Sequence, residues 1–172
     1  MKLVLPTPEY ADAIEAFRQE FIMYGGDSDG MMSLIRLGVD GWFKQIESCK
    51  KQETCPPVWV PTTQFIYVRE SDGKMVGAIQ VRHCFNEFLE KYAGHIGYSV
   101  CPTERRKGYA SQMLHDVLPY CKNELGLDRV LVCCLSDNEA SRKTILKNGG
   151  VYDGTVFEPQ KQVYLERYWI EV

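Results

Sequence analysis

Three consecutive basic residues, Arg105, Arg106 and Lys107, stand directly before Gly108 near the middle of the chain. A glycine allows the backbone to come close to a ligand. If a helix begins here, its first N–H groups have no partner inside the helix, and its positive end lies beside the three cations. Such a turn is suited to bind a phosphate or diphosphate. The chain contains neither G-x-x-x-x-G-K-[ST] nor a G-x-G-x-x-G after a strand, so two familiar phosphate motifs are excluded.

The elements on either side of this basic turn follow from periodicity. Residues 95–100 alternate between apolar and small or polar side chains, which predicts a half-buried strand that stops near Cys101, because Pro102 has no N–H to donate. Beyond the turn, apolar residues recur at helical spacing, which predicts a helix from about Lys107, bent at Pro119. These apolar residues are Ala110, Met113, Leu114, Val117, Leu118 and Cys121.

A second unit of strand and helix comes next. Residues 129–135 form an apolar, β-branched run, which predicts a buried strand. Ser136 and Glu139 have the spacing of a capping box, which predicts that a helix begins there. Residues 148–150 include two glycines, which can take the left-handed conformation that ends helices.

Together the two units resemble the GNAT N-acetyltransferase superfamily. Arg105-x-x-Gly108-x-Ala110 is similar to its acetyl-coenzyme A signature, Q/R-x-x-G-x-G/A. In the second unit, Asn138 and Ser141 fit the family's N-x-x-A/S motif. Gly149 fits the glycine that follows. The resemblance covers about residues 74–172, and it implies an α/β fold in which helices flank a mixed, mostly antiparallel central sheet.

The resemblance also implies an activity: transfer of an acetyl group from acetyl-CoA to a primary amine by direct attack on the thioester. The amine would belong to a small molecule, an amino-acid derivative or a peptide N-terminus. Ser99 and Val100 would hold the pantetheine arm, and the Val100 N–H would donate to the developing oxyanion. The amides of residues 106–111 would hold the pyrophosphate. The expected cofactor-binding residues are Ser99, Val100, Arg105, Arg106, Lys107, Gly108, Tyr109, Ala110, Ser111, Asn138 and Ser141.

Proton transfer is the step for which this chain departs from the family pattern. Many relatives have a tyrosine seven residues after the asparagine, but here that position is Ile145, which has no proton to give. Ser141 is the first candidate for the proton donor, and His95 is the leading candidate for the base because its ordinary pKa lies near neutrality. Further candidates are Tyr98, Tyr152 and Glu166. The isoleucine also motivates an alternative, a non-catalytic CoA-binding or regulatory module on the same fold. A nucleotide-binding protein of another sort is a third reading.

Length and composition limit the other possibilities. The chain has 172 residues, of which 45% are hydrophobic, so we expect one GNAT-like domain over residues 1–172. The apolar run at the N-terminus is too short for a signal peptide, and no stretch reaches the 18 or so apolar residues of a membrane span. The formal net charge of −3 argues against nucleic acid as a partner. Basic residues on the second helix, Arg142, Lys143 and Lys147, stand in a second cluster that we expect to flank the same polyanion.

The seven cysteines contain no C-x-x-C pair, so we expect no metal site, mostly buried thiols and a cytoplasmic location. The acceptor pocket should be built from residues 27–63, residues 85–92 and the last hairpin. Glu87, Glu90, Glu158 and Glu166 would suit a cationic acceptor, although surface carboxylates are common. Exposed ends of the sheet would allow a homodimer. We predict further strands over residues 3–5, 64–69, 75–81, 154–157 and 164–170, a helix from Pro8 to Gly25-Gly26-Asp27, and a helix over residues 41–50.

Overall fold

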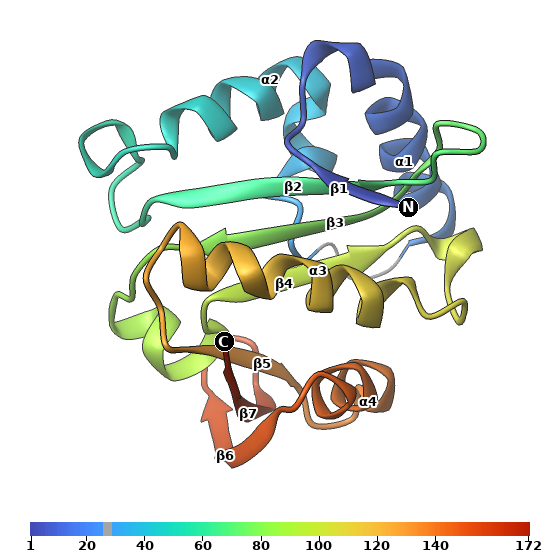
Figure 1. The fold of residues 1–172 in the computed structure, drawn as a ribbon. Coiled ribbons are helices and arrows are strands. Elements are labelled where there is room, and N and C mark those ends of the chain that lie inside the picture. Colours follow the sequence, from blue (N-terminus) through green and yellow to red (C-terminus); the bar gives the residue numbers. More distant parts are fainter. Residues whose placement is uncertain (26–28) are drawn as a thin grey trace.

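A seven-stranded sheet forms the centre of the molecule in the computed structural model, which describes residues 1–25 and 29–172 (Figure 1). The strand order is β1-β2-β3-β4-β5-β7-β6, and every neighbouring pair is antiparallel except β4 and β5. The strands are β1 Lys2–Val4, β2 Thr62–Val68, β3 Met75–Arg82, β4 Ile96–Val100, β5 Arg129–Leu135, β6 Val151–Glu158 and β7 Val163–Glu171. The mixed, mostly antiparallel sheet predicted from the sequence is confirmed.

Helices cover both faces of this sheet (Figure 1). Helix α1 (Ala11–Tyr24) and helix α2 (Leu34–Ser48) pack on one face, whereas α3 (Tyr109–Asn123) packs on the other and α4 (Glu139–Lys147) follows β5. The described residues also form four short helical turns: η1 Pro8–Tyr10, η2 Gln52–Thr54, the π-helical η3 Leu89–Ala93, and η4 Pro102–Glu104.

Two apolar clusters, one on each face of the sheet, hold these layers together. In β2 successive side chains point to opposite faces, so Phe65 and Tyr67 join the α3 cluster while Ile66 and Val68 join the α1–α2 cluster. The apolar face predicted for α3 is confirmed, since Met113, Leu114 and Val117 are fully buried. Each of these side chains contributes about 1.5–3 kcal/mol through burial.

Two predicted boundaries differ from the structure, and a third falls partly on residues that are not described. The helix predicted over residues 41–50 begins at Leu34 instead and contains a break at Gly38. Helix α3 begins at Tyr109 and not at Lys107, because Gly108 takes a left-handed conformation with φ +83°. The predicted end of the first helix lies partly outside the described residues: Gly25 follows α1 as its cap, and Gly26 and Asp27 are not described.

The prediction that Ser136 caps the second helix was wrong. Asn138, and not Ser136, is the N-cap of α4, and its Oδ1 accepts a hydrogen bond from the Ser141 N–H at 3.0 Å. The backbone carbonyl of Ser136 instead accepts a hydrogen bond from Arg142. At the other end, α4 stops before Gly149 in the left-handed conformation, as predicted.

Candidate active site

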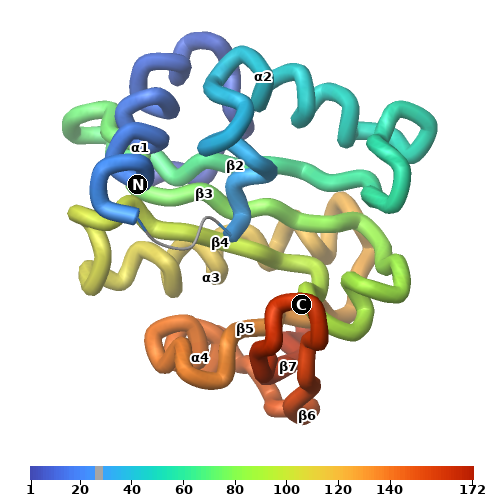
Figure 2. The backbone as a smooth tube through the Cα atoms, turned by 180° about the vertical axis from the view of Figure 1, so that it is seen from behind, coloured from blue at the N-terminus to red at the C-terminus, as the bar shows by residue number. Residues whose placement is uncertain are grey.

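Strands β4 and β5 separate from each other soon after they meet. Along its length β4 pairs with β3, from Ile96 opposite Val81 to Val100 opposite Gly77, but its register with β5 has the single pair Ile96 and Val132. Figure 2 shows the result, in which β5, β7 and β6 lie with α4 on one side and β1 to β4 on the other. Most of β4 therefore presents an unpaired edge.

The backbone groups of β4 that face this open edge can be identified from the ladder with β3. The N–H of Cys101 donates to the carbonyl of Val76, and the N–H of Arg82 donates to the carbonyl of His95. Because backbone groups alternate along an antiparallel strand, the N–H groups of Tyr98 and Val100 point away from β3. The Val100 carbonyl also points away from β3, because it accepts a hydrogen bond from the Arg105 side chain at 3.3 Å. The donor predicted at Val100 thus faces the gap.

Beyond β4, the turn into α3 presents a row of backbone donors. Arg106 and Gly108 both have positive φ angles, +64° and +83°, so the chain curls tightly before the helix. Within the described part of the chain, no N–H group from Arg105 to Ser111 donates to a backbone or side-chain acceptor; the first that does is that of Gln112, to the carbonyl of Gly108. A concave row of free N–H groups at a helix N-terminus binds anions.

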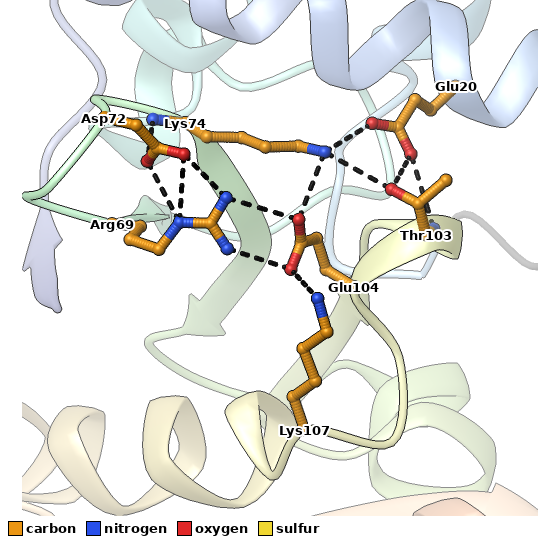
Figure 3. A network of polar contacts seen from close by, with 7 residues as sticks. All are labelled: Glu20, Arg69, Asp72, Lys74, Thr103, Glu104 and Lys107. Carbon is orange, nitrogen blue, oxygen red and sulfur yellow. Dashed lines mark hydrogen bonds and ion pairs between the residues drawn. The ribbon is translucent and has the colours of Figure 1, made fainter.

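A buried carboxylate fixes the base of this turn (Figure 3). Glu104 is 5% exposed, and it accepts hydrogen bonds or ion pairs from Lys107 at 2.7 Å, Arg69 at 3.0 Å and Lys74 at 3.3 Å. Lys74 also pairs with Glu20 of α1 at 2.8 Å. The hydrogen bond from Lys107, together with those from Arg69 and Lys74, lowers the pKa of Glu104 to about 2 against the opposing effect of burial. The turn is thereby tied to β3 and α1.

The three basic residues of the turn have different surroundings. Lys107 is bound to Glu104, so its charge is already compensated. Arg105 bonds to the Val100 carbonyl, and its guanidinium lies 5.9 Å from the centre of the Phe21 ring. Arg106 is exposed and has no partner among the described residues. Of the three, Arg106 is the cation with no competing partner among the described residues.

The C-terminal end of α4 lies against the first turn of α3. The side-chain N–H₂ of Asn148 donates to both the carbonyl and the hydroxyl oxygen of Ser111 at 3.2 Å. Ser111 Oγ therefore keeps its own hydrogen for another acceptor. The sequence indicates only that Asn148 ends a helix. No local pattern predicts its hydrogen bond to Ser111, which lies 37 positions away.

Tyr98 and Ser141 meet across the same gap. The Tyr98 hydroxyl lies 2.8 Å from Ser141 Oγ, which joins β4 to the first turn of α4. Burial raises the pKa of Tyr98 above its ordinary value. Ile145, at the position of the usual family acid, is fully buried in the α3 cluster and packs against Gly150. The hydroxyls that the gap offers are thus those of Tyr98, Ser141 and Ser111.

His95 has surroundings that suit packing better than proton transfer. It is 5% exposed, and its Nδ1 accepts a hydrogen bond from the Leu131 N–H at 2.9 Å. Its ring lies 4.0 Å from that of Phe85, centre to centre. Burial, with a smaller effect of the nearby Arg82 charge, lowers the pKa of His95 to about 4. The ring is neutral near pH 7 but has one nitrogen already in use.

Most of the other residues that the sequence suggested for the site make structural contacts instead. Glu158 is buried and accepts hydrogen bonds from the N–H groups of Gln160 and Lys161 in the last hairpin. Glu166 pairs with Arg142 at 2.7 Å. Lys143 pairs with Glu139, and Tyr152 is exposed on β6 with its hydroxyl on Thr155. The predicted second basic cluster on α4 is therefore largely compensated.

On the face of β4 that α1 and α2 cover, the described part of the connection before α2, residues 29–33, crosses the strand. Gly30 lies so close that a Cβ there would be 2.4 Å from the carbonyl oxygen of Gly97. Trp42 holds the connection in place, because its indole N–H donates to the carbonyl of Met31 at 2.6 Å. Ser99 Oγ also donates to the carbonyl of Asp29. This crossing forms part of one wall beside the site.

A cavity of about 690 Å³ opens next to this crossing. Its lining combines apolar and aromatic side chains with a few polar ones, as ligand pockets do. The lining residues are Met32, Val58, Trp59, Val60, Thr62, Gln80, Arg82, Asn86, Glu87, Phe88 and Leu89. They come from two of the three regions predicted to build the acceptor pocket, and from the ends of β2 and β3. Among the described residues no group of three metal-ligating side chains occurs, and no helix has the length and apolar character to cross a membrane.

Comparisons with known proteins identify the family of this chain. Residues 2–151 match the family model of the acetyltransferase (GNAT) domain. A curated relative, the uncharacterized N-acetyltransferase YoaA of Bacillus subtilis strain 168, is 32% identical over 89 residues, which cover 51% of this chain and 48% of the relative. The match thus spans about half the length of that relative.

Two solved structures share the fold at low sequence identity. The ribosomal-protein-S5-alanine acetyltransferase from Vibrio fischeri has a TM-score of 0.70 at 16% identity, over 98% of this chain and 91% of that one. RimL, the ribosomal L7/L12 alpha-N-protein acetyltransferase in complex with coenzyme A, has a TM-score of 0.72 at 13% identity, over 99% and 93%. The family model, which covers most of the chain, shows that this protein belongs to the acetyltransferase (GNAT) domain family.

Proposed function

We propose that this chain is an acetyl-CoA-dependent N-acetyltransferase that moves the acetyl group to a primary amine of a small molecule, an amino-acid derivative or a peptide N-terminus. The observation that carries the proposal is the row of free N–H groups from Arg106 to Ser111, placed beside the open edge of β4. Coenzyme A has a diphosphate, which such a row of amides can bind, and an extended pantetheine arm, which can lie along the open edge of β4. We propose that residues 1–172 act as one unit.

In this arrangement the pyrophosphate of acetyl-CoA lies on the amides of residues 106–111. Arg106 and the Ser111 hydroxyl add to its binding. The pantetheine arm runs along β4, where Val100 offers its N–H to the thioester oxygen as negative charge develops on it. Asn138 has its Oδ1 committed to the Ser141 N–H, so its side-chain N–H₂ is the group that can reach the arm. The remaining predicted contacts are at Ser99, Arg105, Lys107, Gly108, Tyr109 and Ala110.

For the chemistry, the neutral amine attacks the thioester carbonyl, the C–S bond breaks, the departing thiolate takes a proton, and the proton that the attacking nitrogen loses restores the proton donor. We assign the role of proton donor to Ser141, which Tyr98 supports through their hydrogen bond. The enzyme holds the two reactants together, which supplies much of such a rate. We assign no base role to His95, because its Nδ1 is occupied by the Leu131 N–H.

A non-catalytic CoA-binding or regulatory module is the second candidate, favoured by the buried Ile145 in place of the usual acid. Two measurements separate the proposals. Calorimetry with coenzyme A tests binding, and thiol release from acetyl-CoA tests turnover with a panel of primary amines. Binding with amine-dependent turnover supports the enzyme. Binding without turnover for any amine supports the module, and absence of binding contradicts both.

We also propose a cytoplasmic location and an enzyme that needs neither a metal nor nucleic acid. All seven cysteines are unpaired thiols, which suits a reducing compartment. The net charge of −3 does not suit a nucleic-acid surface. A homodimer remains a prediction; β1 and β6 are the edges of the sheet, and light scattering during size-exclusion chromatography tests it.

A further inference from the structure

The cavity beside β4 contains an arginine without an acidic partner. Arg82, the last residue of β3, lines the cavity and makes no ion pair with any described carboxylate. Its Nη1 donates to the carbonyls of Ala93 at 3.2 Å and Gly94 at 3.1 Å. Burial lowers the pKa of Arg82, whereas the charge of Asp29 acts in the opposite direction. The guanidinium is thus partly buried and has no directly paired carboxylate among the described residues.

Only part of this guanidinium serves the fold. The two N–H groups of Nη1 are used by the carbonyls at the end of η3, where a basic side chain commonly stabilises a helix C-terminus. The Nε and Nη2 groups have no acceptor among the described residues, and neither is among the polar atoms that are shut off from solvent without a partner. Three donors in a planar fork are therefore available to a ligand.

The free side of Arg82 faces the strand that we propose holds the thioester. A Cβ on Gly97 of β4 would lie 3.5 Å from Arg82 Nη2 and 3.4 Å from the side-chain nitrogen of Gln80. Gly97 precedes Val100 by three residues, which is about 10 Å along a strand. A small molecule held at Arg82 thus extends within reach of the acetyl group.

The remaining lining of the cavity is mostly apolar. Val60 and Leu89 are buried, while Trp59 and Phe88 are partly exposed and offer aromatic surface. Apart from one carboxylate, that of Glu87, the lining around Arg82 is neutral, so a ligand that fits Arg82 and the apolar part carries one anionic group and an apolar body. Planar pairing with carboxylates is the interaction for which an arginine fork is best suited.

We propose that Arg82 binds the carboxylate of the acceptor, and that the acceptor is a free amino acid with an apolar side chain. The proposal rests on the N-acetyltransferase function proposed above and specifies its substrate. The carboxylate pairs with the Nε and Nη2 groups, the side chain contacts the apolar lining, and the amine points toward β4. A substrate that lacks the carboxylate leaves Arg82 unpaired, so it is disfavoured.

The test compares amino acids with their amides, which keep the amine and the side chain but lack the negative charge. We would measure kcat/KM for leucine, methionine, phenylalanine and tryptophan and for the four amides. The variants are Arg82→Gln, Arg82→Lys and, as control, Arg36→Gln, which removes an exposed arginine of α2. The acid-to-amide ratio is compared between proteins, so differences in amine basicity cancel.

We expect the wild type and the control to prefer at least one acid over its amide by at least about tenfold. In Arg82→Gln that preference should disappear while the rate with the amide is kept, and Arg82→Lys should be intermediate because it has the charge without the fork. An acid-to-amide ratio that is the same in the wild type and in Arg82→Gln overturns the proposal. So does efficient acetylation of peptide N-termini with no turnover of free amino acids.

A second readout needs neither turnover nor a folded Arg82→Gln protein. 3-Phenylpropionate, which has no amine, should raise the melting temperature of the wild type, and 3-phenylpropionamide should not. Equal effects of the two compounds overturn the carboxylate site. Binding of coenzyme A is measured in parallel: its loss contradicts the proposed function itself, whereas coenzyme A binding with the same acid-to-amide ratio in the wild type and in Arg82→Gln contradicts only the role of Arg82.

Discussion

The hydroxyl groups of Tyr98 and Ser141 lie 2.8 Å apart and join β4 to α4 at the point where β4 leaves β5. A tyrosine hydroxyl is protonated at neutral pH, and burial raises the pKa of Tyr98 further. Ser141 can then accept from Tyr98 and direct its own hydrogen into the gap. Two residues that are 43 positions apart thus form one donor pair where the thiolate is expected to leave.

Replacement of Ser141 by alanine should lower kcat by about 100-fold, because the departing thiolate loses its proton donor. The Tyr98→Phe change should have a smaller effect, about tenfold, since Ser141 remains. The KM for acetyl-CoA should change little in both variants. Steady-state thiol release measures all of these values.

The control for Tyr98→Phe is Tyr152→Phe, which removes an exposed hydroxyl bonded to Thr155 on β6 at 2.7 Å. It should keep the wild-type kcat. An unchanged kcat in Ser141→Ala would show that the proton comes from another group.

Gly108→Val should abolish tight binding of coenzyme A. A Cβ at Gly108 points into open space, which is the space that the diphosphate would fill. We expect affinity to fall by more than about tenfold, and the left-handed backbone to cost about 1–2 kcal/mol of stability. Calorimetry measures the affinity and urea denaturation the stability.

Gly126→Val separates these two effects. Gly126 also has a positive φ, +64°, and open space around its Cβ, but it follows the C-terminal end of α3. The variant should lose similar stability and keep the affinity for coenzyme A. If Gly108→Val binds coenzyme A as tightly as Gly126→Val does, the diphosphate lies elsewhere.

Local signals allowed the elements around the gap to be predicted. Pro102 ends the β4 pairing, and the spacing of Met113, Leu114 and Val117 defines the buried face of α3. The capping error was also local: Ser136 and Glu139 have the right spacing, but the Asn138 side chain reaches the Ser141 N–H and takes the cap instead. A pattern match cannot decide between two acceptors so close in sequence.

Roles that depend on distant residues were not predictable. Arg105, Arg106 and Lys107 look alike in the sequence, yet Lys107 is bound to Glu104, a buried carboxylate that the fold also places beside Arg69, 35 positions away. Arg82 stands just beyond the predicted strand end, and only the fold shows that it lines the cavity.

His95 should remain neutral down to about pH 5, because its pKa in the folded protein is lowered to about 4. In the unfolded chain the pKa of this residue is about 6.5. Titration of His95 therefore does not change the stability above that pH, and it destabilises the folded protein as the pH falls from 6.5 toward 4. A pH titration of the imidazole signals by NMR measures the pKa directly. The signal is assigned with His95→Gln, and a midpoint near neutrality would restore His95 as a candidate base.

Glu104→Gln should destabilise the protein by about 2 kcal/mol at neutral pH, because three cations lose a buried carboxylate. The folded pKa of about 2 lies below the unfolded value, so the contribution is full above about pH 5 and is lost as the pH falls toward 2. The variant should therefore show a shallower loss of stability in acid. Urea denaturation across this pH range measures both effects.

The matched control is Glu70→Gln, which removes an exposed carboxylate paired with the N-terminal amine. Its effect on stability should be much smaller, since exposed ion pairs contribute little. An equal loss in both variants would mean that the Glu104 network does not hold the turn.

Asn138 has two proposed roles, and two substitutions separate them. Asn138→Ala removes the cap of α4, so it should cost about 1 kcal/mol of stability and also weaken coenzyme A binding. Asn138→Ser keeps a good capping oxygen but lacks the side-chain N–H₂, so stability should be nearly unchanged while affinity falls by about tenfold. Thermal denaturation and calorimetry give the two quantities. Wild-type affinity in Asn138→Ser would leave Asn138 with the cap alone, because only the amide donor distinguishes that variant from the native residue.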